Sequence, residues 1–362
     1  MTFDDVLIIK NGRNQRAVEN SNGKYPIYGS GGIMGYADNY ICEEDTVIIG
    51  RKGSINNPIF VEEPFWNVDT AFGLVAKREV LLPRYLYYFC RNYDFERLNK
   101  AVTIPSLTKS DLLKIEITLP SLEIQEKIVN KLLKIEEVIQ ARQQQLQKMD
   151  ELVKARFVEL FGDPVTNPMG WSETTIGEEC FYIKDGPHKS LPDIGKENGG
   201  HPFISVRNIV NGYIDFSSAR YISDEDYADA IKKCHPEKGD MLYSKGGTTG
   251  IAKLIDIDEK FANWVHVAVL KFDKSKLNGI FFENMLNGAY CYEQSQRLTK
   301  GIANRDLVLS AMAQIHIYRP PIELQNQFAG FVKQVDKSKV AVQKALDETQ
   351  LLFGSLMQKY FG

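Results

Sequence analysis

Apolar residues recur at alternating steps of three and four positions in two long stretches of the chain, from Leu132 to Val153 and from Val332 to Phe353. This heptad spacing places one apolar stripe along one face of a helix, the face that packs on a partner helix. The first predicted seam consists of Leu132, Ile135, Ile139, Arg142, Leu146, Met149 and Val153. The second, weaker seam has the same phase and consists of Val332, Val335, Lys339, Val342, Leu346, Thr349 and Phe353.

Both stretches have clear helix boundaries. Pro120 favours a helix start, and the run Gly162-Asp163-Pro164 favours a stop. A helix of some 40 residues spans about 60 Å, too long to bury its stripe within a small domain. We therefore expect the two helices to pack on each other in antiparallel fashion, with one module at each end. The alternative is that each helix packs on its own module.

The two stretches belong to a tandem repeat at a constant offset of 200 residues. This repeat predicts a first module at 1–118, a long helix at 119–162, a linker and second module at 163–318, and a second long helix at 319–362. The coinciding positions include Pro120/Pro320, Gln125/Gln325, Leu146/Leu346, Leu152/Leu352, Lys100/Lys300 and Leu107/Leu307.

The modules themselves alternate short apolar runs with turn residues, which is typical of strands. Such runs lie at 45–50, 72–77, 202–206, 240–244 and 265–272. Each module is predicted to end in a helix, near 83–100 and 281–300, and then in a strand at 114–119 or 314–319 that leads into the long helix. The expected fold class is α+β.

Composition narrows the possible functions. Hydrophobic residues make up 43% of the chain and the net charge is −3, so the chain is globular and has no globally basic surface. No stretch has the roughly 18 uncharged apolar residues of a membrane helix, and we expect a cytoplasmic protein. Its scattered cysteines and histidines give no metal-ligand spacing, so no metal site is expected. The glycine-rich runs at 29–35 and 245–250 do not match a nucleotide-binding loop, and no catalytic constellation emerges.

Four local motifs stand out along the chain, and two of them occur in both repeats. They are KYPIYGSGG (24–32), DTVIIGRKGS (45–54) with GDMLYSKGGTTG (239–250), LPSLEIQEKI with RPPIELQNQF, and the junction FGDPVTNPMGW (161–171). With the paired helices, this arrangement resembles the specificity subunit of type I restriction-modification systems over essentially the whole chain.

The resemblance implies a non-catalytic DNA reader with two target-recognition domains, each contacting half of a split target in double-stranded DNA. It further implies that the long helices set the separation of the half-sites and dock two methyltransferase subunits. No cofactor is expected in this chain. S-adenosylmethionine would be held by the methyltransferase subunits, and ATP by restriction subunits that join them.

Base and phosphate contacts need Arg, Lys, Asn, Gln, Ser and Thr on turns that enter a groove of the duplex. For Lys100 and Lys300, a structural and a phosphate-positioning role stay equally open. The candidate DNA-binding residues are Arg13, Asn14, Gln15, Arg16, Lys24, Tyr25, Arg51, Lys52 and Asn56 in the first module, and His188, Lys189, Arg207, Asn208, Lys245, Thr248, Thr249, Asn304 and Arg305 in the second.

A second hypothesis is a protein scaffold whose coiled coil clamps partners without reading DNA. The acidic net charge and the long apolar seams favour it. Two unlike modules on matched helices disfavour it, because a scaffold has no need to diversify its loops within a preserved frame.

Overall fold

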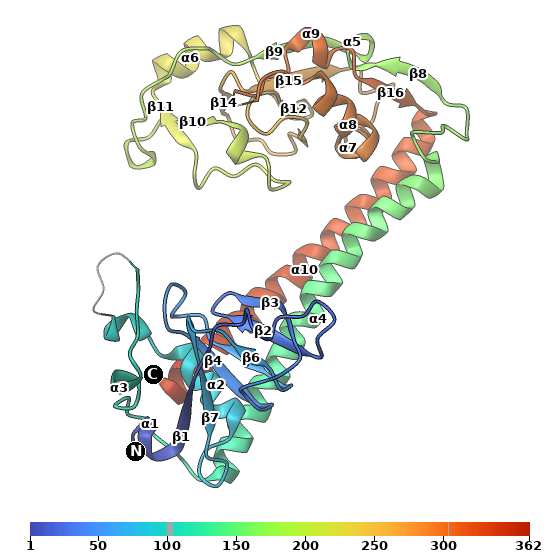
Figure 1. Cartoon of the computed structure of the whole chain (residues 1–362). Coiled ribbons are helices and arrows are strands. Elements are labelled where there is room, and N and C mark those ends of the chain that lie inside the picture. Colours follow the sequence, from blue (N-terminus) through green and yellow to red (C-terminus); the bar gives the residue numbers. More distant parts are fainter. Residues whose placement is uncertain (100–103, 303) are drawn as a thin grey trace. The chain divides into compact units, whose positions relative to one another are not determined.

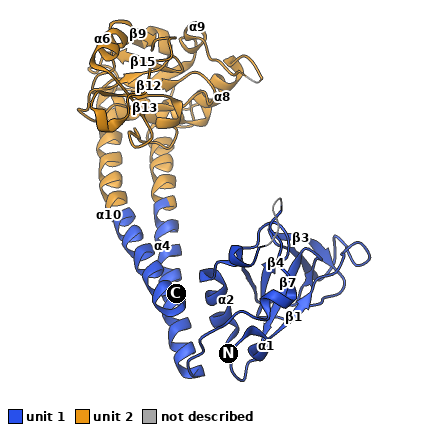
Figure 2. Cartoon of the chain, turned by 90° about the vertical axis from the view of Figure 1, so that its left-hand side faces the viewer, with its two compact units in different colours: residues 1–146, 341–362 blue, residues 147–340 orange. Residues whose placement is uncertain are grey.

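The computed structural model describes residues 1–99, 104–302 and 304–362 (Figure 1). It consists of two compact units, Met1–Leu146 with Ala341–Gly362 and Gln147–Val340 (Figure 2). Each unit contains one mixed module and one segment of each of two 40-residue helices, α4 (Leu122–Phe161) and α10 (Ile322–Phe361). The expected α+β class is confirmed.

The first module is built on an antiparallel sheet with the order β1-β7-β4-β5. Because side chains alternate between the two faces of a strand, Val47 and Ile49 join the core that includes the helices, and Ile48 joins a second cluster on the other face. The strands are β1 (Leu7–Asn11), β7 (Ala71–Ala76), β4 (Thr46–Gly50) and β5 (Ile59–Val61), and a smaller sheet is formed by β3 (Gly32–Ala37), β2 (Tyr25–Gly29) and β6 (Trp66–Asn67).

The helix predicted near 83–100 is divided in the structure. Pro83 occupies the first turn of α2 (Pro83–Asn92), where its fixed φ suits a helix start. Tyr93 and Asp94 then turn extended, and the Asp94 carboxylate accepts a hydrogen bond from the Glu96 amide to start the 3-10 helix η1 (Phe95–Leu98). Two short helices, α1 (Phe3–Val6) and α3 (Lys109–Leu112), complete the module.

The second module repeats this topology. Its main sheet has the order β9-β15-β12-β13, and a small sheet again contains one antiparallel and one parallel pairing. The predicted duplication is therefore visible in the strand order itself. The strands are β9 (Cys180–Asp185), β15 (Val267–Phe272), β12 (Met241–Ser244) and β13 (Ala252–Leu254), with β11 (Arg220–Ile222), β10 (His201–Ile204) and β14 (Ala262–Asn263) in the small sheet.

The helix predicted near 281–300 breaks at Gly288, whose ψ of 153° is extended, and this break separates α7 (Gly279–Asn287) from α8 (Ala289–Leu298). The strand predicted before α10 is β16 (His316–Arg319), which pairs with β8 (Ser172–Thr175). The strand predicted at 114–119 is not formed. Where the second module pairs β16 with β8, the first module has a single bridge between Thr2 and Glu116. The helices are α5 (Ile176–Glu179), α6 (Asp224–Lys233), α7 (Gly279–Asn287), α8 (Ala289–Leu298) and α9 (Leu309–Met312), with 3-10 turns η2 (Lys196–Asn198) and η3 (Val206–Asn208).

The long helices α4 and α10 run antiparallel (Figure 1). In the first unit, Arg142 of α4 donates to the Ala345 carbonyl and the Thr349 hydroxyl of α10. In the second unit, Asp150 of α4 pairs with Lys339 of α10. The structure buries Leu132, Val153, Val332, Val335 and Leu346 of the predicted seam and half-buries Ile135, Ile139, Arg142, Leu146, Met149, Lys339, Val342, Thr349 and Phe353.

Both helices also pack on the modules, so the alternative arrangement is partly realised. In the first unit, Leu132 of α4 and Leu356 and Met357 of α10 belong to the same buried core as the β1-β7-β4 sheet. In the second unit, Phe157 of α4 packs against Phe281 of α7 and Phe328 of α10. Each core is therefore completed by segments far apart in the sequence.

A buried glutamine ties the start of each long helix to its module. Gln125 and Gln325 are fully buried. Each accepts a hydrogen bond from one backbone amide and donates to two backbone carbonyls. The partners of Gln125 are Leu82 N (2.9 Å), Val80 O (2.9 Å) and Pro120 O (3.0 Å), and those of Gln325 are Asn278 N (2.8 Å), Lys276 O (3.1 Å) and Pro320 O (2.7 Å).

Replacing Gln125 by leucine should lower the free energy of unfolding by about 3 kcal/mol, because buried backbone groups lose their partners. Urea denaturation of the purified chain measures this change. The control is Gln144→Leu on the exposed face of the same helix, which should shift stability by less than about 0.5 kcal/mol. Equal effects of the two substitutions would contradict the role given to Gln125.

Candidate nucleic-acid interface

Four segments of the first module meet at one edge of its main sheet. Strands β1 and β4 end where β7 begins, since Asn11 pairs with Phe72 and Gly50 pairs with Ala71. The loops after β1 and β4 therefore lie beside the loop before β7. We call residues 12–16, 51–54, 68–70 and 104–106 the first loop edge.

Backbone hydrogen bonds join these segments. The Arg13 amide donates to the Asn67 carbonyl (2.8 Å), the Arg51 amide to the Thr70 carbonyl (2.8 Å), and the Gly53 amide to the Pro105 carbonyl (3.0 Å). At Gly12 a Cβ atom would lie 1.8 Å from the Val68 carbonyl oxygen, so only glycine allows this close approach. The backbone thus holds the loops together without using their side chains.

The first loop edge carries a dense group of exposed polar side chains. Arg13, Asn14, Arg16, Arg51 and Lys52 are exposed, and Gln15 is half-buried. Among the described residues, none of the four cations in this group forms an ion pair. Cations without carboxylate partners on neighbouring turns are suited to binding an anionic backbone.

The second module has a matching edge. Asp185 ends β9 opposite Ala268, and Ser244 ends β12 opposite Val267. The Lys245 amide donates to the His266 carbonyl (2.8 Å) and the Gly247 amide to the Arg305 carbonyl (3.0 Å). We call residues 186–189, 245–249, 264–266 and 304–306 the second loop edge.

The second loop edge exposes fewer cations than the sequence suggested. His188, Lys189, Thr248, Asn304 and Arg305 are exposed there, and Arg305 also donates to the side chain of Gln296. Thr249 is buried, and its hydroxyl lies 2.9 Å from that of Thr299. Its hydroxyl thus joins the second loop edge to the residue that follows α8.

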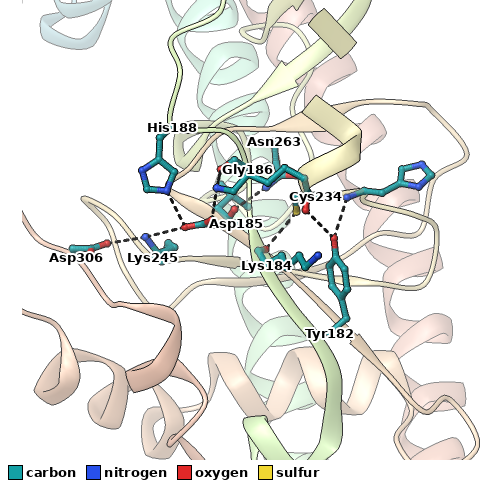
Figure 3. A network of polar contacts seen from close by, with 12 residues as sticks. Tyr182, Lys184, Asp185, Gly186, His188, Cys234, Lys245, Asn263 and Asp306 are labelled. Atoms are coloured by element: carbon teal, nitrogen blue, oxygen red, sulfur yellow. Dashed lines mark hydrogen bonds and ion pairs between the residues drawn. The ribbon is translucent and has the colours of Figure 1, made fainter. Parts of the chain in front are cut away.

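Lys245 is also buried. Its side chain is 7% exposed, and its ammonium lies 3.0 Å from Asp306 Oδ1 and 3.6 Å from Asp185 Oδ2 (Figure 3). Asp185 in turn accepts a hydrogen bond from Lys233 at 2.8 Å and lies 3.7 Å from His188 Nε2. Lys245 was predicted as a DNA contact. In the structure its buried ammonium is instead paired with two carboxylates from other parts of the chain, one buried (Asp185) and one partly exposed (Asp306).

Two predicted asparagines also serve the fold. Asn56 donates to Asp94 and accepts from the Phe95 amide, so it joins its loop to η1. Asn208 is buried, and its side chain bonds Ser205, Asp215 and Ser218. Both amides have their hydrogen-bonding capacity largely occupied within the module.

The remaining candidates lie apart from the loop edges or at their margin. Lys24 and Tyr25 lie at the start of β2, whereas the end of that strand, at Tyr28, pairs with Asn67 and leads toward the first loop edge. Exposed Arg207 donates to the Ser218 carbonyl (2.6 Å) and lines a cavity of about 210 Å³ beside Trp264. Lys300 is exposed and its backbone pairs with Asp306, and Lys100 lies outside the described residues.

Sequence reasoning missed a pair of buried asparagines that shape both edges. Asn67 donates to the Ala71 carbonyl (3.1 Å) and Asn263 to the Val267 carbonyl (2.7 Å), closing the 68–70 and 264–266 loops. Each asparagine follows Phe-Xaa and stands four residues before the strand start, a repeated signal in the sequence. Sequence reasoning also missed the two ion-pair partners of Lys245, which are Asp185 and Asp306. Nothing in the spacing of these residues along the sequence marks them as a pair of partners.

Reactive groups are not prominent in the described part of the chain. All five cysteines are buried, and burial raises the pKa of Cys42 to about 12 and that of Cys234 to about 11. These thiols are therefore protonated at neutral pH and poor nucleophiles. Within the described ranges, no group of three or more His, Cys, Asp or Glu side chains is placed to hold a metal ion, and no helix is long and apolar enough to span a membrane.

Comparison with known proteins assigns the chain to a family. Residues 1–150 and 168–349 match the family model of the type I restriction modification DNA specificity domain. The chain therefore belongs to the family of type I restriction-modification specificity subunits, as the sequence motifs predicted.

Individual relatives agree with this assignment. The chain is 23% identical over 330 residues to the type I restriction enzyme MjaIX specificity subunit of Methanocaldococcus jannaschii, covering 86% of this chain and 74% of the relative. It is 23% identical over 362 residues to a putative type I restriction enzyme specificity subunit of Haemophilus influenzae, covering 92% and 86%. The fold matches the crystal structure of the S subunit from M. genitalium with a TM-score of 0.65 at 18% identity, over 100% of this chain and 95% of that one.

The burial of Lys245 predicts its chemical behaviour. An amine-reactive reagent at limiting concentration should modify Lys52 and Lys189 rapidly and spare Lys245, because the buried, ion-paired ammonium is shielded from the reagent. Peptide mass spectrometry of the folded chain measures the three rates. Modification of Lys245 at the rate of Lys189 would contradict the placement, and all three should react alike in urea.

Proposed function

We propose that this chain reads a split target in double-stranded DNA, one half with each loop edge. The observation that carries the proposal is that both modules build their edges from equivalent backbone hydrogen bonds and then display different side chains. A preserved frame with variable exposed polar groups is what two independent readers of different base sequences require.

The chain serves this role without catalysing a reaction. Methyltransferase subunits, two of them by the resemblance, supply the chemistry on bound S-adenosylmethionine, and restriction subunits that use ATP join the same complex. The long helices offer a docking surface, since Leu351 and Leu352 of α10 are 75% and 50% exposed. Contiguous exposed apolar side chains, rather than single ones, are typical of an interaction site.

The partners also supply charge. The net charge of the chain is −3, so its free cations at the loop edges cannot by themselves neutralise many phosphates. We therefore expect the isolated chain to bind DNA weakly and the complex with methyltransferase subunits to bind tightly and with strong salt dependence.

The scaffold hypothesis remains the competitor. It accounts for the acidic charge and the exposed apolar residues of the helices. It does not account for the clustered, unpaired cations of the first loop edge, which a protein scaffold does not need.

The proposal is tested by co-expressing the chain with its methyltransferase subunits and sequencing the methylome of the host DNA. Methylation should appear at one two-part sequence and vanish when this chain is omitted. Methylation that is independent of the chain, or dependent on it but without sequence preference, would refute DNA reading and favour the scaffold.

The two modules should be separable by mutation. Arg13→Ala with Arg16→Ala should relax or weaken recognition of one half-site, and Asn304→Ala with Arg305→Ala should affect only the other, because each pair belongs to a different module. Losses of about 1–3 kcal/mol per specific contact are expected. The methylomes of the two variants measure this, and a pair that altered both half-sites alike would contradict the assignment.

The spacing between the half-sites should depend on the helices. Four residues inserted near Gln143-Gln144-Gln145 add about 6 Å and nearly preserve the facing of the helix, so the unspecified spacer should grow by about one or two base pairs. A two-residue insertion rotates the seam by about half a turn and should prevent assembly. The methylome of the four-residue variant decides, and an unchanged spacer in an active complex would be contrary to this expectation.

A further inference from the structure

Arg51 and Lys245 occupy the same position in the two modules. Each directly follows the last residue of its strand, β4 or β12. The Arg51 carbonyl accepts a hydrogen bond from the Leu107 amide (2.9 Å), and the Lys245 carbonyl accepts one from the Leu307 amide (2.7 Å). Equivalent backbone bonds therefore place one cation at the same point of each loop edge.

The neighbours of this cation differ between the modules. Asp185 ends β9 opposite Ala268, and the equivalent end of β1 is Asn11, opposite Phe72. Asp306 lies in the segment bridged to Gly246, and Ser106 lies in the equivalent segment, bridged to Lys52. At the positions equivalent to the two carboxylates that hold Lys245, the first module thus has an asparagine and a serine.

The consequence for the two cations is opposite. Lys245 has a 7% exposed side chain between two carboxylates, and moving it away from both would leave a buried ammonium without an anionic partner. Arg51 is exposed, its guanidinium carbon lies 5.7 Å from the centre of the Phe72 ring, and it forms no ion pair with any described residue. Packing on an aromatic ring restricts the stem of an arginine while leaving its donors available.

We propose that Arg51 contacts a DNA phosphate in the half-site read by the first module, whereas Lys245 is a positioning residue that contacts no DNA and holds together the segments of the second loop edge. The inference rests on the proposed function and deepens it. Lys245 joins the turn after β12 to the end of β9 and to the segment before α9, which carry His188 and Arg305 (Figure 3).

The experiment uses the complex of the full chain with its methyltransferase subunits, bound to a duplex carrying the target. The dissociation constant is measured over a series of salt concentrations. Arg51→Ala should weaken binding roughly five- to ten-fold at 0.1 M salt and reduce the slope of log K against log salt by about 0.9, the value for one phosphate contact. Wild-type slope in Arg51→Ala overturns the proposal for Arg51.

Arg78→Ala is the matched control. It removes the same charge from the same sheet, but Arg78 pairs at 2.9 Å with Asp45, which precedes β4 and lies at the other end of that strand from Arg51. The slope of this variant should equal that of the wild type. An equal loss of slope in both variants would show a general charge effect and overturn the assignment of Arg51 to a contact.

Lys245 is tested by a readout that separates contact from positioning. Lys245→Met should weaken binding while leaving the salt slope unchanged, and Lys245→Arg should restore affinity. Should Lys245→Met fail to fold, Asp306→Asn serves in its place, with the same expectation of lower affinity and unchanged slope. A slope reduced by about 0.9 in Lys245→Met would make Lys245 a phosphate contact and overturn its positioning role.

Exchanging the residues around Arg51 and Lys245 between the modules should lower the salt slope in one variant and raise it in the other. Asn11→Asp, Arg51→Lys and Ser106→Asp together should bury the cation of the first module and lower the slope by about 0.9. The reverse exchange in the second module consists of Asp185→Asn, Lys245→Arg and Asp306→Ser. It should free the cation there and raise the slope by about the same amount. Slopes that do not move in these directions contradict the inference.

The failure of this inference is distinguishable from failure of the proposed function. If the wild-type complex binds duplex DNA without sequence preference, the proposed function fails. If the wild-type complex recognises its target and Arg51→Ala keeps the wild-type slope, the reading function stands and only the role of Arg51 is lost.

Discussion

The burial of two long apolar stripes is the constraint on which the rest of the structure depends. A 40-residue helix cannot cover its stripe with one small module, so α4 and α10 cover each other and contribute to both cores. Leu132 and Leu356 complete the first core, and Phe157 and Phe328 complete the second. Neither module is finished by its own contiguous sequence, which ties each module to the helix pair. Gln125 and Gln325 fix the starts of the same helices with buried hydrogen bonds.

The loop edges combine a constant backbone frame with side chains that differ between the modules. Their segments are joined by main-chain hydrogen bonds and by Asn67 or Asn263, so the side chains of the turns are left free to change. A substitution at Arg13 or Lys189 changes the side chains that the edge exposes to solvent, since both residues are exposed and lie outside the core. A substitution at Asn263 would alter the edge itself. This division of tasks allows the exposed side chains to differ between modules while the fold is kept.

Local patterns predicted the frame well, and long-range contacts limited the prediction of the site. Heptad spacing predicted the seam, and the constant offset predicted the duplication. Gly162 predicted the end of α4, and in the structure this glycine has a φ of 78°. Lys245, Thr249 and Asn208 look like exposed polar loop residues in the sequence, but partners such as Asp306, Thr299 and Ser218 bury or occupy them. The break at Gly288 and the missing strand at 114–119 likewise depend on packing and pairing that no local window contains.

The central claim is that DNA lies against the two loop edges. It is tested most directly by photo-crosslinking from single positions in the methyltransferase complex on its target duplex. A photoreactive residue at Asn14 and one at Lys189 should each crosslink to DNA, to opposite halves of the target. Controls at Arg78 and Lys274, exposed positions at the other end of each main sheet, should not crosslink. Crosslinks from the control positions with none from Asn14 or Lys189 would contradict the account.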